Sequence, residues 1–194
     1  MAQIKLNATY GLTGALPAVS GANLTTLNAT NISSGTLNAA RYSGGKVVKI
    51  HHSHPTDLSE QTFQTNTWTD VTGLSLTITP VSSSSKFLLQ TGLQYRLRTS
   101  SSTNQPNFGV RFERDDSSIY RTNNYTFGID IEAHQSGTFL MGVATLNYVD
   151  SPATASEIVY TVGVRTETDT GIDIVDINDD GGDGTFLYAI EFND

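Results

Sequence analysis

The sequence predicts an all-β protein, built as an antiparallel β-sandwich, from its composition and from the pattern of its apolar residues. Ser, Thr, Asn and Gly take the place of charged residues, which make up only 15% of the chain. This composition favours strands and turns over surface helices. From Gln61 onward, apolar residues alternate with polar ones in short runs separated by turn residues, as they do in sandwiches and barrels. No window of about 10–12 residues carries an apolar stripe with the period of a helix.

The expected strands follow this alternation along the chain. They are residues 74–78, 86–98, 108–112, 139–148, 158–164 and 185–192, with shorter strands between them. Pro80 ends the first of these, since proline cannot donate to a strand ladder. Residues 139–148 are apolar on both faces, which predicts a strand that is buried on both sides. About eight to ten strands result, enough for a two-sheet sandwich, and we assign Trp68 to its core.

Residues 1–45 do not have the composition of a core. Their only aromatic residues are Tyr10 and Tyr42, and the phrase Leu-Asn-Ala recurs at residues 6, 27 and 37. Leu27, Ile32 and Leu37 are five residues apart, a spacing that matches neither a helix nor a strand. Such a segment is ordered only with other chains, as an extended shaft or attachment peptide, or is a flexible tail. We divide the chain into an N-terminal segment, residues 1–55, and a head domain, residues 56–194.

The charge is distributed unevenly between these two parts. The formal net charge is −8, yet residues 1–56 contain four basic side chains and no acid. The remaining seven basic and nineteen acidic side chains follow. Nucleic acids and anionic membranes attract basic patches, so we expect neither as a partner. The chain has no cysteine, which excludes disulfides and thiol catalysis, and no apolar run approaches the roughly 20 residues of a membrane span.

Several phrases of the sequence resemble fibre-type structural proteins of tailed phages of marine hosts. The phrases are DVTGLSLTITP at residues 70–80 with VSSSSKFLL at 81–89, LNYVDSPAT at 146–154, and GLTGALPAVSGANL at 11–24 with ISSGTL at 32–37. The resemblance implies a homotrimer with a jelly-roll-like head, a virion location, attachment to another virion protein through residues 1–45, and binding to a glycan or protein of the host surface. The alternative is a capsid decoration or head-fibre protein with the same head.

A histidine pair at the junction of the two parts is a candidate metal site. If the strand from Lys46 continues, Val48, Ile50, His52 and His54 share one face. Three copies of His52 and His54 around the axis of a homotrimer would supply six imidazoles to a transition metal. The alternative is a solvated polar linker that ends at Pro55. No cofactor is required by either interpretation.

An acidic turn near the C-terminus is a second candidate. Asp176, Asn178 and Asp180, followed by Gly181, match the opening of a calcium loop. The bidentate Glu of an EF-hand is missing, so the prediction is a weak calcium site within the turn at residues 176–184. The alternative is an ordinary hairpin turn, since Asp and Gly tolerate positive φ.

The candidate receptor-binding residues are Tyr120, Arg121, Asn123, Asn124 and Tyr125. They combine aromatic faces with guanidinium and amide groups, the chemistry that binds sugar rings and their hydroxyls. Their alternative role is packing at a subunit interface. We identify no catalytic residues and expect no enzyme. A polysaccharide depolymerase is the remaining alternative, because a pair of catalytic carboxylates is a tertiary feature.

Overall fold

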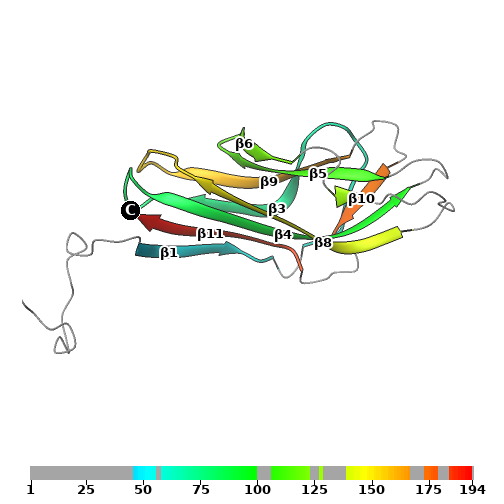
Figure 1. Ribbon diagram of the computed structural model, residues 1–194, viewed down its shortest axis with the longest axis horizontal. Coiled ribbons are helices and arrows are strands. Elements are labelled where there is room, and N and C mark those ends of the chain that lie inside the picture. The colour runs from blue at the N-terminus through cyan, green and yellow to red at the C-terminus, as the bar shows by residue number, and fades with distance from the viewer. Residues whose placement is uncertain are drawn as a thin grey trace, which may run out of the picture. The chain divides into compact units, whose positions relative to one another are not determined.

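A computed structural model describes residues 46–55, 58–99, 106–122, 127–128, 139–166, 173–178 and 184–193. Within these ranges all regular structure is β-strand, and no helix could span a membrane. The strands, labelled in Figure 1, are β1 (Lys46–Ser53), β2 (Gln61–Phe63), β3 (Thr69–Ile78), β4 (Lys86–Thr99), β5 (Asn107–Arg114), β6 (Ser117–Arg121), β7 (Phe127–Gly128), β8 (Phe139–Asp150), β9 (Ile158–Thr166), β10 (Asp173–Ile177) and β11 (Phe186–Asn193).

The strands form two antiparallel sheets. In sheet A, β4 pairs with β8 along one side and with both β11 and β10 along the other, and β1 and β2 continue the sheet beyond β11 and β10. In sheet B the order is β3, β9, β5 and β6, and the short β7 also pairs with β5. Both sheets are therefore about four strands wide, and their principal edges are β1 and β8 in sheet A and β3 and β6 in sheet B.

The connectivity is that of a jelly roll. The eight principal strands in chain order are β1, β3, β4, β5, β6, β8, β9 and β11, and they pair from the outside inward. The first pairs with the last (β1 with β11), then β3 with β9, β4 with β8, and β5 with β6. A ribbon paired in this way and folded across two layers is the double-sheet arrangement of jelly rolls. The expected all-β, jelly-roll-like sandwich is confirmed.

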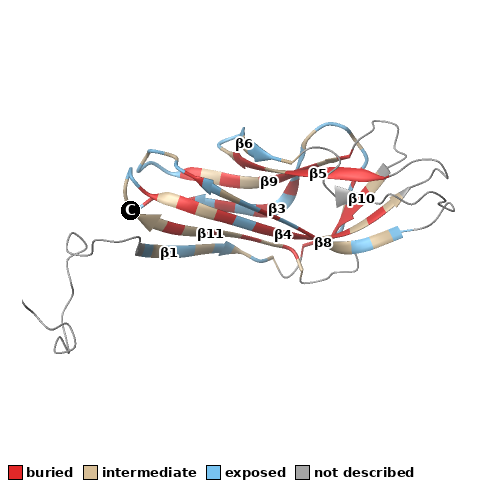
Figure 2. Ribbon diagram, viewed as in Figure 1, coloured by how far each residue is buried: buried red, intermediate tan, exposed pale blue. Residues whose placement is uncertain are grey.

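The core lies between the inner faces of the two sheets. The alternation predicted for residues 86–98 is present in β4, where the odd-numbered residues from Phe87 to Leu97 are buried (Figure 2). Opposite them in sheet B lie Phe108, Val110 and Phe112 of β5 and Tyr160 of β9, all fully buried. The largest of these form tilted ring pairs, such as Phe87 with Tyr160 and Tyr95 with Phe108, which adds directional packing to the burial.

Two sequence-based expectations about the strands differ from the structure. β8 belongs to a two-layer sandwich, so only one of its faces packs on the core; Phe139, Met141 and Val143 on the other face are exposed. The two-sided apolar pattern therefore did not mean two-sided burial. Strand β1 pairs along its length with β11, so it belongs to sheet A although residues up to 55 were assigned to the N-terminal segment.

Candidate functional site

The outward face of sheet A carries most of the exposed large apolar side chains of the described residues. Six of the eight lie on its two edge strands: Val47 and Ile50 on β1, and Phe139, Met141, Val143 and Val149 on β8. Exposed positions alternate with buried or half-buried ones along most of β8 (Figure 2). A long apolar edge strand is a pairing or docking surface unless something covers it. We call the outward side of sheet A the sheet A face.

An aliphatic row crosses the sheet A face at one level. Ile50 pairs with Ile190 of β11, Ile190 pairs with Leu88 of β4, and Leu88 pairs with Val149 of β8. Paired residues of neighbouring strands point to the same side and contact each other. The row therefore joins the two edges of the sheet by four aliphatic side chains in register, with the most exposed members, Ile50 and Val149, at its ends.

Aromatic rings of β11 flank this row. Phe186, Tyr188 and Phe192 alternate with buried residues and are themselves half-buried. Phe186 lies over Gly92 of β4, where an added Cβ would come within 2.5 Å of the Phe186 ring. Its centroid is 5.0 Å from that of Tyr188. Glycine at position 92 thus lets the Phe186 ring lie flat against the sheet and extends the apolar surface beyond the aliphatic row.

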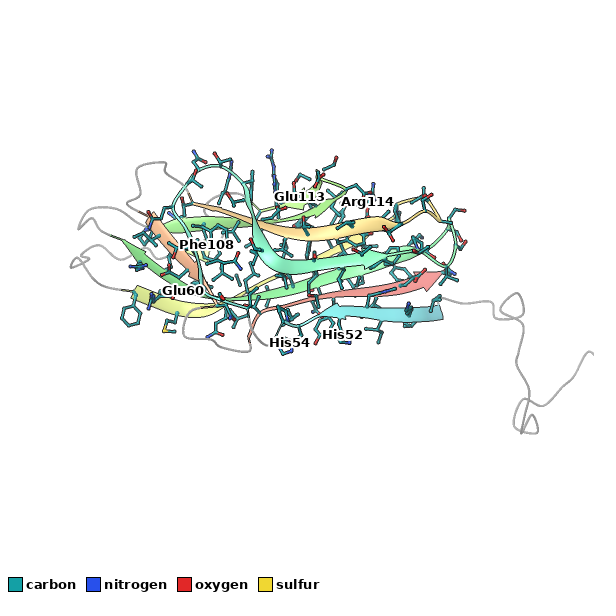
Figure 3. The ribbon with its side chains drawn as sticks, turned by 180° about the vertical axis from the view of Figure 1, so that it is seen from behind. His52, His54, Glu60, Phe108, Glu113 and Arg114 are labelled. Atoms are coloured by element: carbon teal, nitrogen blue, oxygen red, sulfur yellow. The ribbon has the colours of Figure 1, made fainter. Side chains whose placement is uncertain are left out.

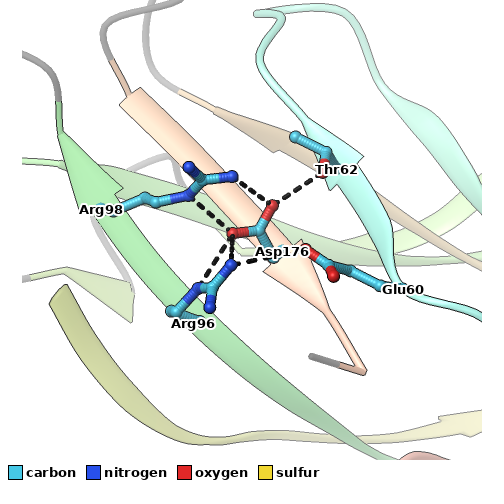
Figure 4. Close-up of polar contacts among 5 residues, drawn as sticks. All are labelled: Glu60, Thr62, Arg96, Arg98 and Asp176. Atoms are coloured by element: carbon cyan, nitrogen blue, oxygen red, sulfur yellow. Dashed lines mark hydrogen bonds and ion pairs between the residues drawn. The ribbon is translucent and has the colours of Figure 1, made fainter. Parts of the chain in front are cut away.

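The other end of the sheet A face is polar and centres on Asp176 of β10 (Figure 4). The Asp176 carboxylate is fully buried and accepts hydrogen bonds from Arg98 Nε at 2.8 Å, Arg96 Nη2 at 3.2 Å and Thr62 Oγ1 at 2.8 Å. Arg96 also reaches Glu60 Oε1 at 3.5 Å. Burial alone would raise the pKa of Asp176, but the hydrogen bonds from Arg98, Thr62 and Arg96 outweigh it and hold the pKa below its ordinary value.

This cluster engages the carboxylate that the calcium prediction assigns to Asp176. Both of its oxygens accept hydrogen bonds from guanidinium and hydroxyl donors, and two arginine cations lie beside it. The side-chain NH2 group of Asn178 donates a hydrogen bond to the Leu58 carbonyl, whereas its Oδ1 is buried without a hydrogen-bond partner among the described residues. Asp180 lies outside the described residues. The sequence match to a calcium loop arose because β10 ends at the turn, with Asp176 still inside the strand.

The histidines near the end of β1 face different ways. His51 points inward, where its Nε2 lies 3.3 Å from Oε2 of the fully buried Glu191. His52 and His54 are exposed and lie on the outer side of β1, as Figure 3 shows. The His52 ring lies 6.1 Å from that of Tyr188. Among the described residues no group of three metal-ligating side chains is assembled within one chain, so the predicted metal site depends on other copies.

A bulge changes which residues of β1 share the face with His52. The register shifts between Val47 and Lys49, so that Val47 pairs with Phe192 and Lys49 pairs with Glu191. Val48 is the additional residue, and it is half-buried whereas Val47 is exposed. The predicted face of Val48, Ile50 and His52 therefore contains Val47 in place of Val48. A strict period of two cannot anticipate a bulge.

The candidate receptor segment is only partly described. Tyr120 lies on β6 and stacks on Tyr148 of β8, with ring centroids 4.9 Å apart and planes within 10° of parallel. The stack joins an edge of sheet B to an edge of sheet A, which gives Tyr120 a structural contact. Arg121 is exposed at the end of β6. Asn123, Asn124 and Tyr125 lie outside the described residues.

Trp68 is not a core residue, contrary to the prediction. It is half-buried, and the guanidinium groups of Arg165 and Arg111 lie 4.8 Å and 5.1 Å from its ring centroid. Both arginines extend from strands of sheet B, where alternate residues face the core, so the Trp68 ring lies on the outward side of that sheet. Composition assigns tryptophan to a core by its size, but flanking arginines can hold it on a surface through cation–π contacts.

A carboxyl pair lies beside this tryptophan. Arg111 Nη2 is 2.7 Å from Glu113 Oε1 and 3.8 Å from Asp70 Oδ1. Burial raises the pKa of Glu113, and the hydrogen bond and negative charge of Asp70 raise it further against the opposing effect of Arg111. Asp70 also borders a hollow of about 290 Å³ between residues 61–65 and β3, lined mainly by threonine hydroxyls and glutamine amides. No local sequence motif marks this group, because its members come from separate strands.

Comparisons with known proteins give no family. No family model matches the chain, and no curated protein matches it. Among solved structures, the insecticidal delta-endotoxin Cry8Ea1 from Bacillus thuringiensis is similar with a TM-score of 0.34 at 12% identity, over 69% of this chain and 20% of that one. The structure of infectious bursal disease virus, Gt strain, is similar with a TM-score of 0.35 at 11% identity, over 75% and 37%.

T=1 particles derived from infectious bursal virus give a TM-score of 0.32 at 12% identity, over 75% of this chain and 35% of that one. This chain thus spans between a fifth and two fifths of the length of these proteins. We therefore argue the function from the chain's own residues.

Proposed function

We propose that this chain is a virion structural protein, a homotrimeric phage fibre or fibre-like appendage. Residues 1–45 attach it to the particle and begin the trimer, and the jelly-roll head, which includes β1, contacts the host cell surface. In this proposal the role is structural and adhesive, and no residue acts catalytically. The alternative is a capsid decoration or head-fibre protein with the same head, located on the capsid instead of the tail.

The observation that carries the proposal is the exposed apolar character of the sheet A face. Ile50, Met141, Val143 and Val149 are each close to half exposed or more. Exposed apolar surface of this extent on a small sandwich indicates a protein that functions in an assembly. Jelly rolls recur in viral capsid proteins and in lectins, which supports both the particle and the adhesive part of the proposal by analogy.

The location on the virion and the adhesive role can be tested on phage particles. Antibody against the head should label the tail in electron micrographs, and the purified protein should block phage adsorption to its host. Labelling of the capsid would favour the decoration protein, and an unlabelled particle would contradict the proposal. Oligomeric mass, measured by light scattering coupled to gel filtration, should be three times 20.9 kDa.

The metal site at His52 and His54 remains a proposal that depends on this trimer. Both side chains are exposed at the outer side of the sheet. Elemental analysis of the purified trimer should find a transition metal that is lost in the His52→Ala/His54→Ala variant. A parent trimer without metal would refute the site and leave the trimer unaffected.

A further inference from the structure

The sheet A face has two apolar edges rather than one. Val47 and Ile50 lie on β1, and Phe139, Met141, Val143 and Val149 lie on β8. Two strands, β11 and β4, separate the edges, so the edges are about 14 Å apart at the usual strand spacing. The aliphatic row joins the two edges across β11 and β4.

We propose that the sheet A face is the contact surface between copies of this chain, with the β1 side of one copy against the β8 side of the next. This inference rests on the proposed function, in which the chain is a homotrimer. A head-to-tail contact needs two different complementary patches on each copy, and repetition by rotation closes it into a ring. The two opposite apolar edges of sheet A are such a pair of patches.

The charge distribution favours a second copy as the occupant. The outward residues of β8 and β11 that form the face include Met141, Val143, Tyr188 and Ile190, and none of the outward residues of these two strands is charged. β4 adds the outward cations Lys86, Arg96 and Arg98, and both of these arginines pair with Asp176, the carboxylate that faces outward from β10. Identical acidic chains repel each other, so a self-contact must exclude uncompensated acids. A cationic partner would select an acidic face instead.

The two contacts of each copy share this face. Four strands of about eight to twelve residues cover roughly 500–750 Å², so each contact uses about half of that area, whereas a stable interface takes roughly 800 Å² from each partner. A stable trimer therefore also needs contacts outside the sheet A face. The N-terminal segment leads directly into β1. In the proposed trimer, joining the N-terminal segments of three copies therefore brings their β1 strands near neighbouring copies.

Engineered cysteines can test the contact because the chain has none of its own. Ile50→Cys and Val149→Cys place a thiol at the two ends of the aliphatic row, where the native side chains are 57% and 49% exposed. Val81→Cys is the matched control, since Val81 is 63% exposed and lies in the β3–β4 connection. In a single copy all three thiols are accessible. In the native full-length assembly, labelling with iodoacetamide should be roughly tenfold slower at positions 50 and 149 than at 81, and equal in urea.

Circular dichroism confirms the fold of each variant, and Val143→Cys replaces Val149→Cys if that variant fails to fold. Trimeric cysteine variants in which the thiols at positions 50 and 149 label as fast as the thiol at position 81 would contradict this contact surface but not the trimer. Protection at only one of the two positions would overturn the head-to-tail arrangement. A parent that is monomeric by light scattering would overturn the trimer and this inference together. An assembly of another size in which positions 50 and 149 are both protected would contradict the trimer but support the contact surface.

Discussion

Tyr160 donates its hydroxyl hydrogen to Oδ2 of Asp150 at 2.7 Å inside the sandwich, where the side chains of both residues are buried. The same carboxylate accepts two hydrogen bonds from Arg114 Nη1, at 2.6 and 2.8 Å. Burial raises the pKa of Tyr160, and the negative charge of Asp150 raises it further, so the hydroxyl keeps its proton. The contact ties β9 of sheet B to the end of β8 in sheet A.

We expect Tyr160→Phe to lower the free energy of unfolding by about 1.5–3 kcal/mol, the usual value for a lost hydrogen bond to a charged group. Urea unfolding followed by circular dichroism measures the difference. Tyr120→Phe is the matched control, because its ring contact is with Tyr148 and survives loss of the hydroxyl. Equal stabilities of the two variants would contradict the role of the Asp150 contact.

The Tyr120–Tyr148 stack should contribute about 0.5–1.5 kcal/mol beyond the area that it buries. Tyr120→Ala should therefore destabilise the head, whereas Tyr120→Phe should not. A double-mutant cycle with Tyr148→Ala isolates the pairwise energy. A coupling energy of zero would mean that the two rings stack without stabilising the edge.

Two buried carboxylates predict a loss of stability in acid. Asp176 and Glu191 have ordinary pKa values of 3.8 and 4.5, and both are lowered in the folded chain. For Glu191, burial acts to raise the pKa, and the hydrogen bonds from Ser85, the Val81 amide and His51 outweigh it. The unfolded chain binds protons at these carboxylates more tightly than the folded chain does. Each carboxylate therefore contributes fully to the free energy of unfolding above its ordinary pKa. This contribution is lost as the pH falls through the lowered folded value.

Unfolding temperatures measured from about pH 7 down to about pH 2 should therefore fall most steeply below about pH 4. Asp176→Asn should lower the stability at neutral pH, because it leaves Arg96 and Arg98 without their shared anion, and should flatten the acid limb of the curve. An acid limb identical to that of the parent would show that Asp176 is not among the groups that titrate there.

Glu113 should have the opposite effect. Its pKa is raised in the folded chain, so the folded state binds the proton more tightly than the unfolded state does. The resulting stabilisation is present below the ordinary value of 4.5 and is lost as the pH rises through the raised value. Glu113→Gln should remove this decline from the stability curve. The decline would persist in the variant if another group caused it.

Trp68 should be held on sheet B by its two arginines at about 0.5–1 kcal/mol for each cation–π contact. Trp68→Ala removes both cation–π contacts, whereas Arg111→Ala and Arg165→Ala each remove one. The lost ring contacts should therefore lower the free energy of unfolding more in Trp68→Ala than in either arginine variant. Trp68 is the only tryptophan of the chain, so its fluorescence reports this contact directly. An emission spectrum that does not change when either arginine is replaced would contradict the stacking.

The fold was predictable because one physical signal dominates it. Alternation of apolar and polar residues marks the inner face of β4 and of β11, and this signal survives without knowledge of neighbours. The same signal wrongly predicts that β8 is buried on both faces. Apolar residues on the outer face of a strand give the same sequence pattern whether a second sheet or another copy of the chain covers them. Only Val149 of the aliphatic row lies within the apolar residues 139–149, and the register that aligns it with residues of three other strands cannot be predicted from local sequence.

The site residues were less predictable because their partners come from distant strands. Asp176 is a predicted calcium ligand, and in the structure β4 places two arginines against it. Trp68 is a predicted core residue, and in the structure Arg111 of β5 and Arg165 of β9 lie over its ring instead. In both cases the partners come from other strands, so sheet topology and not the local sequence determines them.

The place of β11 between β1 and β4 has a consequence for how the head is made. β11 is synthesised after all the other strands of the described residues, yet it supplies the hydrogen-bond partners of β1 and of the first half of β4. Until residues 186–193 have left the ribosome, β1 has no strand to pair with and β4 has an open edge. The sandwich therefore closes only after its last strand is translated, through contacts between segments far apart in the chain, which are intrinsically slow to form. During that interval the apolar strands of several nascent chains are exposed together, so yield in expression should depend on synthesis rate and on chaperones.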